Sequence, residues 1–178
     1  PYRRKTFLRN IMSDWDVIHS SKNMAWRTPR SLFDWLNGEF KFDLDAAASM
    51  TNTLCKKYIT RKQNALTGDW THHACCPLPK VFVNPPYGRN IKDWIAKAER
   101  EQHNGCTVVM VLMACTDTLW WKQAWARASE VRLLTGRVKF LDTSGLEVAS
   151  APKGTAIIIW HPFGEERHDP KVSLVDWR

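Results

Sequence analysis

An apolar run that breaks into two consecutive prolines constrains this 178-residue chain more than any other feature. The run Val81-Phe82-Val83 is typical of a buried strand, and Asn84-Pro85-Pro86-Tyr87-Gly88 follows it directly. Each proline fixes φ and removes a backbone N–H, so the strand has to end there. Open α/β sheets bind their ligands at the carboxyl ends of strands. The sequence therefore predicts a rigid loop at the ligand-binding edge of a sheet.

This loop offers a small set of polar groups beside an aromatic ring. The Asn84 side chain and the Pro85 carbonyl can both accept hydrogen bonds, and the prolines contribute no competing donors. Two such acceptors suit a planar group that bears an NH₂, while the Tyr87 ring stacks on its plane. A strand that simply ends in a proline turn is the alternative. The complete five-residue loop directly after the apolar run favours the binding site.

Segments typical of strands and of helices alternate along the chain. One helix is expected to begin at Thr28-Pro29, with Thr28 as N-cap and Pro29 in the first helical position, and to end near Asn37-Gly38. Such alternation predicts a three-layer α/β fold with a mostly parallel sheet. The expected strands are residues 40–45, 55–60, 81–83, 106–113, 131–134 and 155–160, and the other expected helices are residues 91–98 and 121–128.

A second candidate site lies at the end of the strand expected over residues 40–45. The Asp43 and Asp45 carboxylates can accept hydrogen bonds from hydroxyl or ammonium groups, and small residues from Ala46 onward allow a ligand to approach closely. There is no glycine-rich phosphate loop and no Walker lysine, so adenosine without phosphates fits better than NAD or ATP. A solvated strand end is the alternative.

The helix start at residues 26–29 offers free N–H groups that attract a carboxylate, although a plain helix cap explains the same residues. Asn64 lies in the polar segment before the proline loop, where it could reach adenine or ribose; ordinary turn chemistry is the alternative. The segment from His72 to Cys76 contains metal-ligand types, but adjacent ligands do not readily close one tetrahedral site. We therefore expect no metal.

Composition narrows the class of partner and the compartment. A net charge of +8 favours a polyanion, most simply nucleic acid. No apolar stretch approaches the roughly 18 residues of a membrane span, and five cysteines without a framework spacing favour a reducing, cytoplasmic environment. Residues 1–22 are interpreted as a basic, flexible arm and residues 23–178 as one catalytic domain.

Seven segments, taken in order over roughly residues 25–160, resemble the phage-type Dam family of DNA N-6-adenine methyltransferases. One departure is Asn64, where the family pattern often has an aspartate. The matching segments are Trp26-Arg27-Thr28-Pro29, Phe42-Asp43-Leu44-Asp45-Ala46-Ala47, Cys55 with Tyr58, Asp69-Trp70, Val81 to Gly88, Trp94 with Lys97-Ala98, and Gly136-Arg137-Val138-Lys139-Phe140.

The resemblance implies a Rossmann-like methyltransferase fold, S-adenosylmethionine as methyl donor and an adenine flipped out of double-stranded DNA as target. It implies no metal, no obligate protein partner and, for a phage-encoded protein, the host cytoplasm. The catalytic residues it implies are Asn84, Pro85, Pro86 and Tyr87, and the cofactor-binding candidates are Trp26, Thr28, Pro29, Asp43, Asp45, Ala46 and Asn64.

Target recognition is expected from a basic loop, since a chain of this length leaves no room for a separate recognition domain. Arg137, Lys139 and Lys153 are the candidates, and a surface loop without a target role is the alternative. Methylation of RNA or of a protein glutamine by the same loop remains a second hypothesis for the activity. A third is a DNA-binding relative without catalysis, against which the intact proline loop argues.

Overall fold

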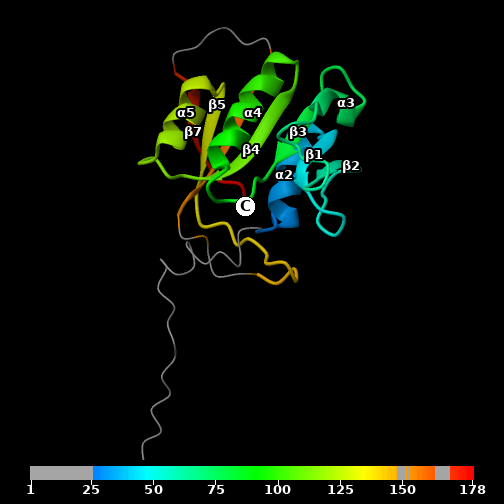
Figure 1. Cartoon of the computed structure of the whole chain (residues 1–178). Helices are drawn as coiled ribbons and strands as arrows, with labels where there is room; N and C mark the ends of the chain where they lie inside the picture. The colour runs from blue at the N-terminus through cyan, green and yellow to red at the C-terminus, as the bar shows by residue number, and fades with distance from the viewer. Residues whose placement is uncertain (1–25, 148–150, 152, 163–168) are drawn as a thin grey trace, which may run out of the picture.

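The computed structural model describes residues 26–147, 151, 153–162 and 169–178. Helices and strands alternate along these residues and build a sheet with helices packed on it (Figure 1). The elements are α2 (Arg30–Phe40), β1 (Leu44–Ala48), β2 (Lys57–Thr60), α3 (Trp70–Ala74), β3 (Lys80–Val83), α4 (Ile91–His103), β4 (Thr107–Met113), α5 (Leu119–Arg127), β5 (Glu130–Leu134), β6 (Thr155–Trp160) and β7 (Lys171–Val175).

The strands form one sheet in the order β2-β1-β3-β4-β6-β5-β7. Strands β2, β1, β3 and β4 pair in parallel, β6 is antiparallel to both of its neighbours, and β7 is parallel to β5. Every strand except β6 therefore runs in the same direction. The mostly parallel three-layer α/β fold predicted from the sequence is confirmed, and it is compatible with a Rossmann-like methyltransferase fold.

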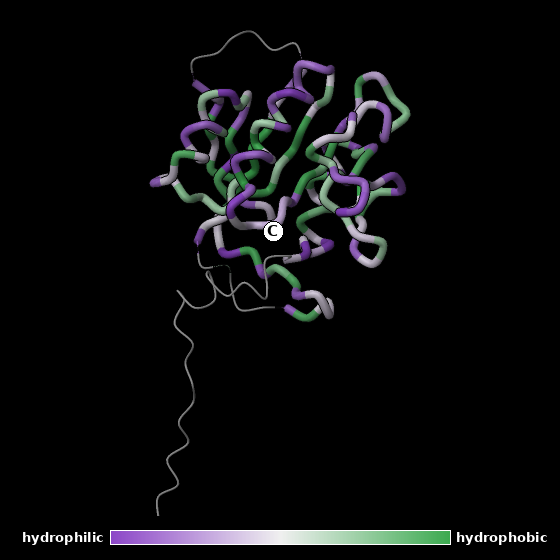
Figure 2. The backbone as a smooth tube through the Cα atoms, viewed as in Figure 1, coloured by the Kyte–Doolittle hydropathy of each residue, from purple (hydrophilic) through white to green (hydrophobic). Residues whose placement is uncertain are grey.

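Side chains that alternate along the strands build a core on each face of the sheet. Helices α3, α4 and α5 cover one face, where Trp70, Trp94 and Trp121 are buried against strand residues such as Val83. Helix α2 and the segment after β5 cover the other face, around Phe82. Hydrophobic residues accordingly line the strands in Figure 2, and hydrophilic ones lie toward the outside.

The topology reverses between β1 and β3. From β1 the chain continues to β2 on one side, and from β3 it crosses through α4 to β4 on the other side. The carboxyl ends of β1 and β3 therefore flank a topological switch point, where open α/β sheets bind their ligands. The start of α2, the proline loop and the segment after β5 all lie at this carboxyl edge, the lower edge in Figure 1.

Several element bounds differ from those predicted. The strand expected over residues 40–45 is wrong, because Phe40 continues the apolar i, i+4 stripe of Leu32 and Leu36 and ends α2. Lys41 then adopts a left-handed conformation with φ of 57°, and β1 begins only at Leu44. Helix α2 also runs beyond the expected end near Asn37-Gly38.

The start of α2 differs too, because Pro29 occupies the N-cap position and the helix begins at Arg30. Thr28 is therefore not the N-cap. Neither helix α3 nor strand β7 is among the elements expected from the sequence. The basic arm expected over residues 1–22 lies outside the described residues.

Two checks for other protein classes apply to the described part of the chain. None of its helices is long and apolar enough to cross a membrane. No group of three or more His, Cys, Asp or Glu side chains in that part is placed to hold a metal ion. The five cysteines are free thiols, and Cys106 is fully buried.

Candidate active site

The Asn84 side chain is held by two bonds that leave its oxygen without a partner. Asn84 Nδ2 donates to the Trp26 carbonyl at 2.8 Å and to Thr28 Oγ1 at 3.0 Å. Because a carbonyl can only accept, the NH₂ end of the amide must face Trp26. Asn84 Oδ1 is buried and has no hydrogen-bond partner in the described structure. Buried polar atoms are rarely left unpaired, so this acceptor is available to a donor that the described residues do not supply.

The fold explains why Asn84 points this way. It follows Val83, which faces α4, so strand alternation directs Asn84 to the same face as Phe82 and α2. The residues just before α2 are held there by a backbone bridge, in which Arg27 N donates to the Leu141 carbonyl at 2.8 Å and Leu141 N to the Arg27 carbonyl at 2.9 Å. This bridge places the Trp26 carbonyl and the Thr28 hydroxyl over the end of β3.

The remaining loop residues turn from one face of the sheet toward the other. Pro85 is buried and Pro86 exposed, and no described residue donates to the Pro85 carbonyl. Tyr87 is half-buried, and its hydroxyl lies 3.5 Å from the Val111 carbonyl, the outer limit of a hydrogen bond. Burial raises the pKa of Tyr87 above its ordinary value, so the phenol is neutral near pH 7.

Asp45 lies on the neighbouring strand β1, on the same face of the sheet as Asn84, and its side chain is 4% exposed. Its carboxylate accepts hydrogen bonds from Ala47 N at 3.2 Å and from Leu54 N at 3.1 Å, which ties down the connection between β1 and β2. Burial raises the pKa of Asp45 to about 6, although the two backbone bonds act in the opposite direction. This carboxyl therefore titrates near neutral pH, as groups in binding sites often do.

The structure brings most of the expected cofactor residues together. Trp26 and Thr28 contact Asn84, and Pro29 follows them directly. Because Asp45 is paired with Phe82 in the register of β1 and β3, Ala46 lies level with the end of β3. Asp45 and Ala46 are the second and third residues of β1, so they do not form the strand end expected from the sequence, but they lie level with the end of β3 and near the Asn84 amide.

Two of the expected cofactor residues lie elsewhere. Asp43 precedes β1 and accepts a hydrogen bond from Lys80 N at 2.9 Å, so it stands at the amino ends of β1 and β3, away from Asn84. Asn64 follows β2, two strands away from β3, where it is exposed with a left-handed φ of 53°. Its carbonyl accepts bonds from Thr67 and Gly68, as in an ordinary turn.

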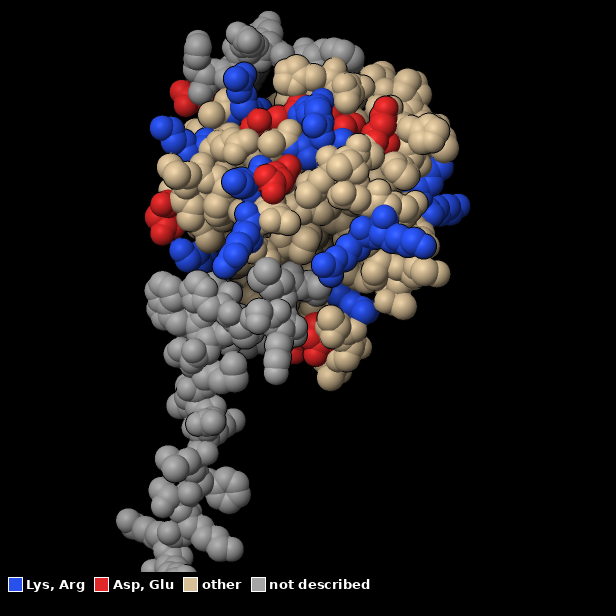
Figure 3. All heavy atoms as spheres, viewed as in Figure 1, with Lys and Arg blue, Asp and Glu red and all other residues tan. Residues whose placement is uncertain are grey.

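The three residues expected to bind DNA already have partners within the protein. Arg137 donates to the Ala151 carbonyl, Lys139 pairs with Glu147 at 3.2 Å, and Lys153 pairs with Asp117 at 3.4 Å. Exposed ion pairs of this kind are worth about 0–1 kcal/mol, so a phosphate can readily replace the carboxylate. On the face shown in Figure 3, Lys and Arg are spread over both halves, including the lower part toward the carboxyl edge.

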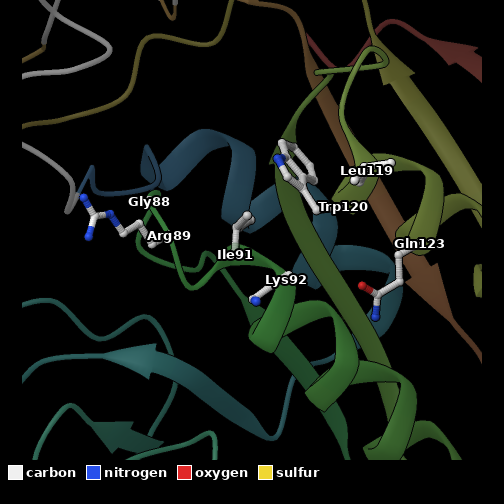
Figure 4. Close-up of a pocket in the computed structure, with 7 residues that line it drawn as sticks. All are labelled: Gly88, Arg89, Ile91, Lys92, Leu119, Trp120 and Gln123. Carbon is white, nitrogen blue, oxygen red and sulfur yellow. The ribbon is translucent and has the colours of Figure 1, made fainter.

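Sequence reasoning missed a groove that adjoins the proline loop on the α4–α5 side (Figure 4). It has a volume of about 350 Å³ and combines the start of α4 with the start of α5, which are almost thirty residues apart. Nothing in the local sequence of either helix indicates that they meet there. Its lining residues are Gly88, Arg89, Ile91, Lys92, Leu119, Trp120 and Gln123.

An open α/β sheet with an Asn-Pro-Pro-Tyr loop at its switch point and a buried aspartate on the neighbouring strand is compatible with a methyltransferase of Rossmann-like fold. Comparison with known families agrees with this class. The chain belongs to the family described as DNA N-6-adenine-methyltransferase (Dam), whose family model matches residues 17–176.

Two phage proteins are among its relatives. The DNA N-6-adenine-methyltransferase of Haemophilus phage HP1 (strain HP1c1) is 30% identical over 156 residues, which cover 85% of this chain and 86% of the relative. The DNA N-6-adenine-methyltransferase of Escherichia phage T1 is 29% identical over 157 residues, covering 79% of this chain and 63% of the longer relative.

Proposed function

We propose that this protein transfers a methyl group from S-adenosylmethionine to the exocyclic amine of adenine in DNA. Membership of the family supports the reaction and the substrate. The observation that carries the site assignment is the buried, unpartnered Asn84 Oδ1, beside a Pro85 carbonyl that also lacks a donor in the described structure. An adenine amine has two N–H groups, one for each acceptor.

The residues of the loop prepare the amine for attack. Asn84 Oδ1 and the Pro85 carbonyl accept its two protons and so orient the nitrogen lone pair, while the Tyr87 ring stacks on adenine. S-Adenosylmethionine supplies an electrophilic methyl group on a sulfonium. The nitrogen forms the new bond to carbon as the carbon–sulfur bond breaks, sulfur keeps the electron pair, and the amine then loses one proton to water. Holding two groups in this geometry is a major source of acceleration.

The cofactor site that fits this arrangement comprises Trp26, Thr28, Pro29, Asp45 and Ala46, around the end of β3 and the residues of β1 level with it. A buried carboxylate suits the hydroxyl or ammonium groups of the donor, and Ala46 leaves room for a close approach. Asp43 and Asn64 are left out because of their positions. The proposed reaction does not require a metal ion, because the methyl group on the sulfonium is already electrophilic.

The raised pKa of Asp45 can be tested without measuring methyl transfer. Its pKa is 3.8 as an ordinary carboxyl and about 6 in the fold, so the folded state binds more protons between these values. We therefore expect this group to lower the free energy of unfolding of the unliganded protein as pH rises from about 4 to about 6, by roughly 3 kcal/mol in total. Urea unfolding of wild type and Asp45→Asn at several pH values measures it, since the variant lacks this slope.

Cofactor binding should respond to the same group in the opposite direction. A donor that hydrogen-bonds to the Asp45 carboxylate favours the charged form, so its affinity should increase as pH rises through about 6. Calorimetry with S-adenosylmethionine checks this. If Asp45→Asn binds as tightly as wild type at every pH, Asp45 holds only the β1–β2 connection and does not contact the cofactor.

The target adenine has to leave the duplex, because its amine is paired and stacked there. We place the duplex along the carboxyl edge, with Arg137, Lys139 and Lys153 exchanging their carboxylate or carbonyl partners for phosphates. Each phosphate contact should add about one unit to the salt dependence of binding. The host cytoplasm, where phage DNA is accessible, is the expected place of action.

The decisive experiment is incorporation of tritiated methyl groups by the purified protein into duplex DNA, RNA and a mixture of proteins. We expect label in adenine of DNA, and Asn84→Ala serves as the matched inactive control. Sequencing DNA from cells that express the protein, with reads sensitive to methylated adenine, then identifies the target site. Label in RNA or glutamine instead would replace the proposed substrate, and no transfer to any acceptor would favour a non-catalytic DNA-binding relative.

A further inference from the structure

The groove beside the proline loop lies on the other side of that loop from the proposed cofactor site. Ile91, which lines it, belongs to the core beneath α4 and α5, whereas Asn84 and Asp45 face α2. In Figure 4, Ile91 stands between the Gly88–Arg89 turn and Trp120. The loop from Asn84 to Gly88 therefore forms a wall with the cofactor residues behind it and the groove in front.

The chemistry of the groove favours a polyanion with flat rings. Arg89 and Lys92 are exposed, and within the described part of the chain neither makes an ion pair. Among the described residues, no Asp or Glu lines the groove. Leu119 is 87% exposed at its rim, beside the half-buried indole of Trp120. Cations for phosphates and an indole for a sugar or base are the features that proteins use to bind a nucleic-acid strand.

We propose that this groove binds the target DNA strand next to the extruded adenine, with Arg89 and Lys92 on its phosphates and Trp120 against the neighbouring sugar or base. The inference rests on the proposed methyl transfer to DNA and adds a contact surface that Arg137, Lys139 and Lys153 do not provide. In this proposal, the groove holds the DNA strand while its target adenine is flipped out of the base stack.

The reaction geometry supports this direction of approach. In-line displacement puts the attacking nitrogen and the leaving sulfur on opposite sides of the methyl group, so the base must reach Asn84 Oδ1 from the side away from the cofactor. That route passes the end of the loop at Gly88, which lines the groove. The strand that carries the base therefore crosses the groove as it leaves the duplex.

A double-mutant cycle between protein and DNA tests the contact. The duplex contains the target site identified by sequencing, and one phosphate on either side of the target adenine is replaced by an uncharged methylphosphonate. Arg89→Ala, Lys92→Ala or the neutral phosphate alone should each lower affinity roughly eightfold at 0.1 M salt, the effect of one lost counterion release. Combining the variant with the neutral phosphate that it contacts should lower affinity little further.

Lys122→Ala is the matched control, because Lys122 is exposed on the same helix α5 but does not line the groove. Its effect should simply add to that of the neutral phosphate. Additive effects for both Arg89→Ala and Lys92→Ala in a protein that methylates DNA would overturn the groove assignment, as would an equal loss of S-adenosylmethionine affinity in these variants. A wild type that methylates no DNA would instead overturn the proposed function, so the two failures are distinguishable.

Discussion

Asn84→Ala is expected to lower the rate of methyl transfer to DNA about 10²- to 10³-fold, the usual effect of losing one preorganised polar contact at a reacting centre. The loss should appear in kcat, because the proposed contact of Asn84 Oδ1 is with the amine that reacts. Single-turnover methylation with saturating DNA and cofactor measures it. Cofactor affinity should stay within a few-fold of wild type, and an equal loss of cofactor binding would mean that Asn84 is structural.

The orientation of the Asn84 amide supplies a finer version of this test. Thr28→Val removes one of the two acceptors that hold Nδ2, so a roughly 2- to 12-fold lower rate is expected, with Thr28→Ser restoring most of it. Asn84→Asp would place a carboxylate oxygen against the Trp26 carbonyl. We expect it to retain some activity, and more at low pH, because a protonated carboxyl can donate to that carbonyl. If the rate of Asn84→Asp instead falls as pH is lowered, in parallel with wild type, this arrangement is contradicted.

The proline loop and its acceptors were predictable from the sequence because they depend on local chemistry. Val81 to Gly88 combines an apolar run, two residues without backbone N–H groups and one amide, and each of these restricts the chain independently of its surroundings. The buried runs β4 and β6 were predicted for the same reason. Continuous apolar segments of that length have few other places in a small α/β fold.

The partners of Asn84 were not predictable in this way. One of them is the main-chain carbonyl of Trp26, 58 residues earlier, and a carbonyl leaves no trace in the sequence. Residues 26–29 were interpreted as the start of a helix with Thr28 as its cap, because Thr before Pro is typical of one. In the fold, the Thr28 hydroxyl instead accepts a hydrogen bond from Asn84. Tertiary contact decided between two uses of one side chain.

The acidic strand shows a different limit. Phe40, Phe42 and Leu44 alternate with polar residues as in a strand, but Phe40 also fits the i, i+4 stripe of the preceding helix. Where both periods fit, the boundary depends on which core the side chain can reach. The helix extends to Phe40 and β1 begins only at Leu44, so Asp43 lies before the strand and Asp45 lies within it.

The largest expected effect on stability comes from a buried ion pair far from the reacting groups. Lys97 and Glu101, one turn apart on α4, pair with each other and are 3% and 1% exposed. Lys97 Nζ also donates to the Gly68 carbonyl at 2.5 Å, and Glu101 accepts from Trp70 N at 3.3 Å. The pair thus joins α4 to the start of α3, in the connection between β2 and β3.

Lys97→Met should lower the free energy of unfolding by about 3–5 kcal/mol, because it leaves the Glu101 carboxylate buried without its cation. The double variant Lys97→Met/Glu101→Gln should recover most of that loss, since glutamine is neutral and still accepts from Trp70 N. Urea unfolding of the wild type and both variants at one pH measures the difference. A double variant as unstable as the single one would mean that Lys97 acts through its bond to Gly68, which both variants lack, and not by neutralising Glu101.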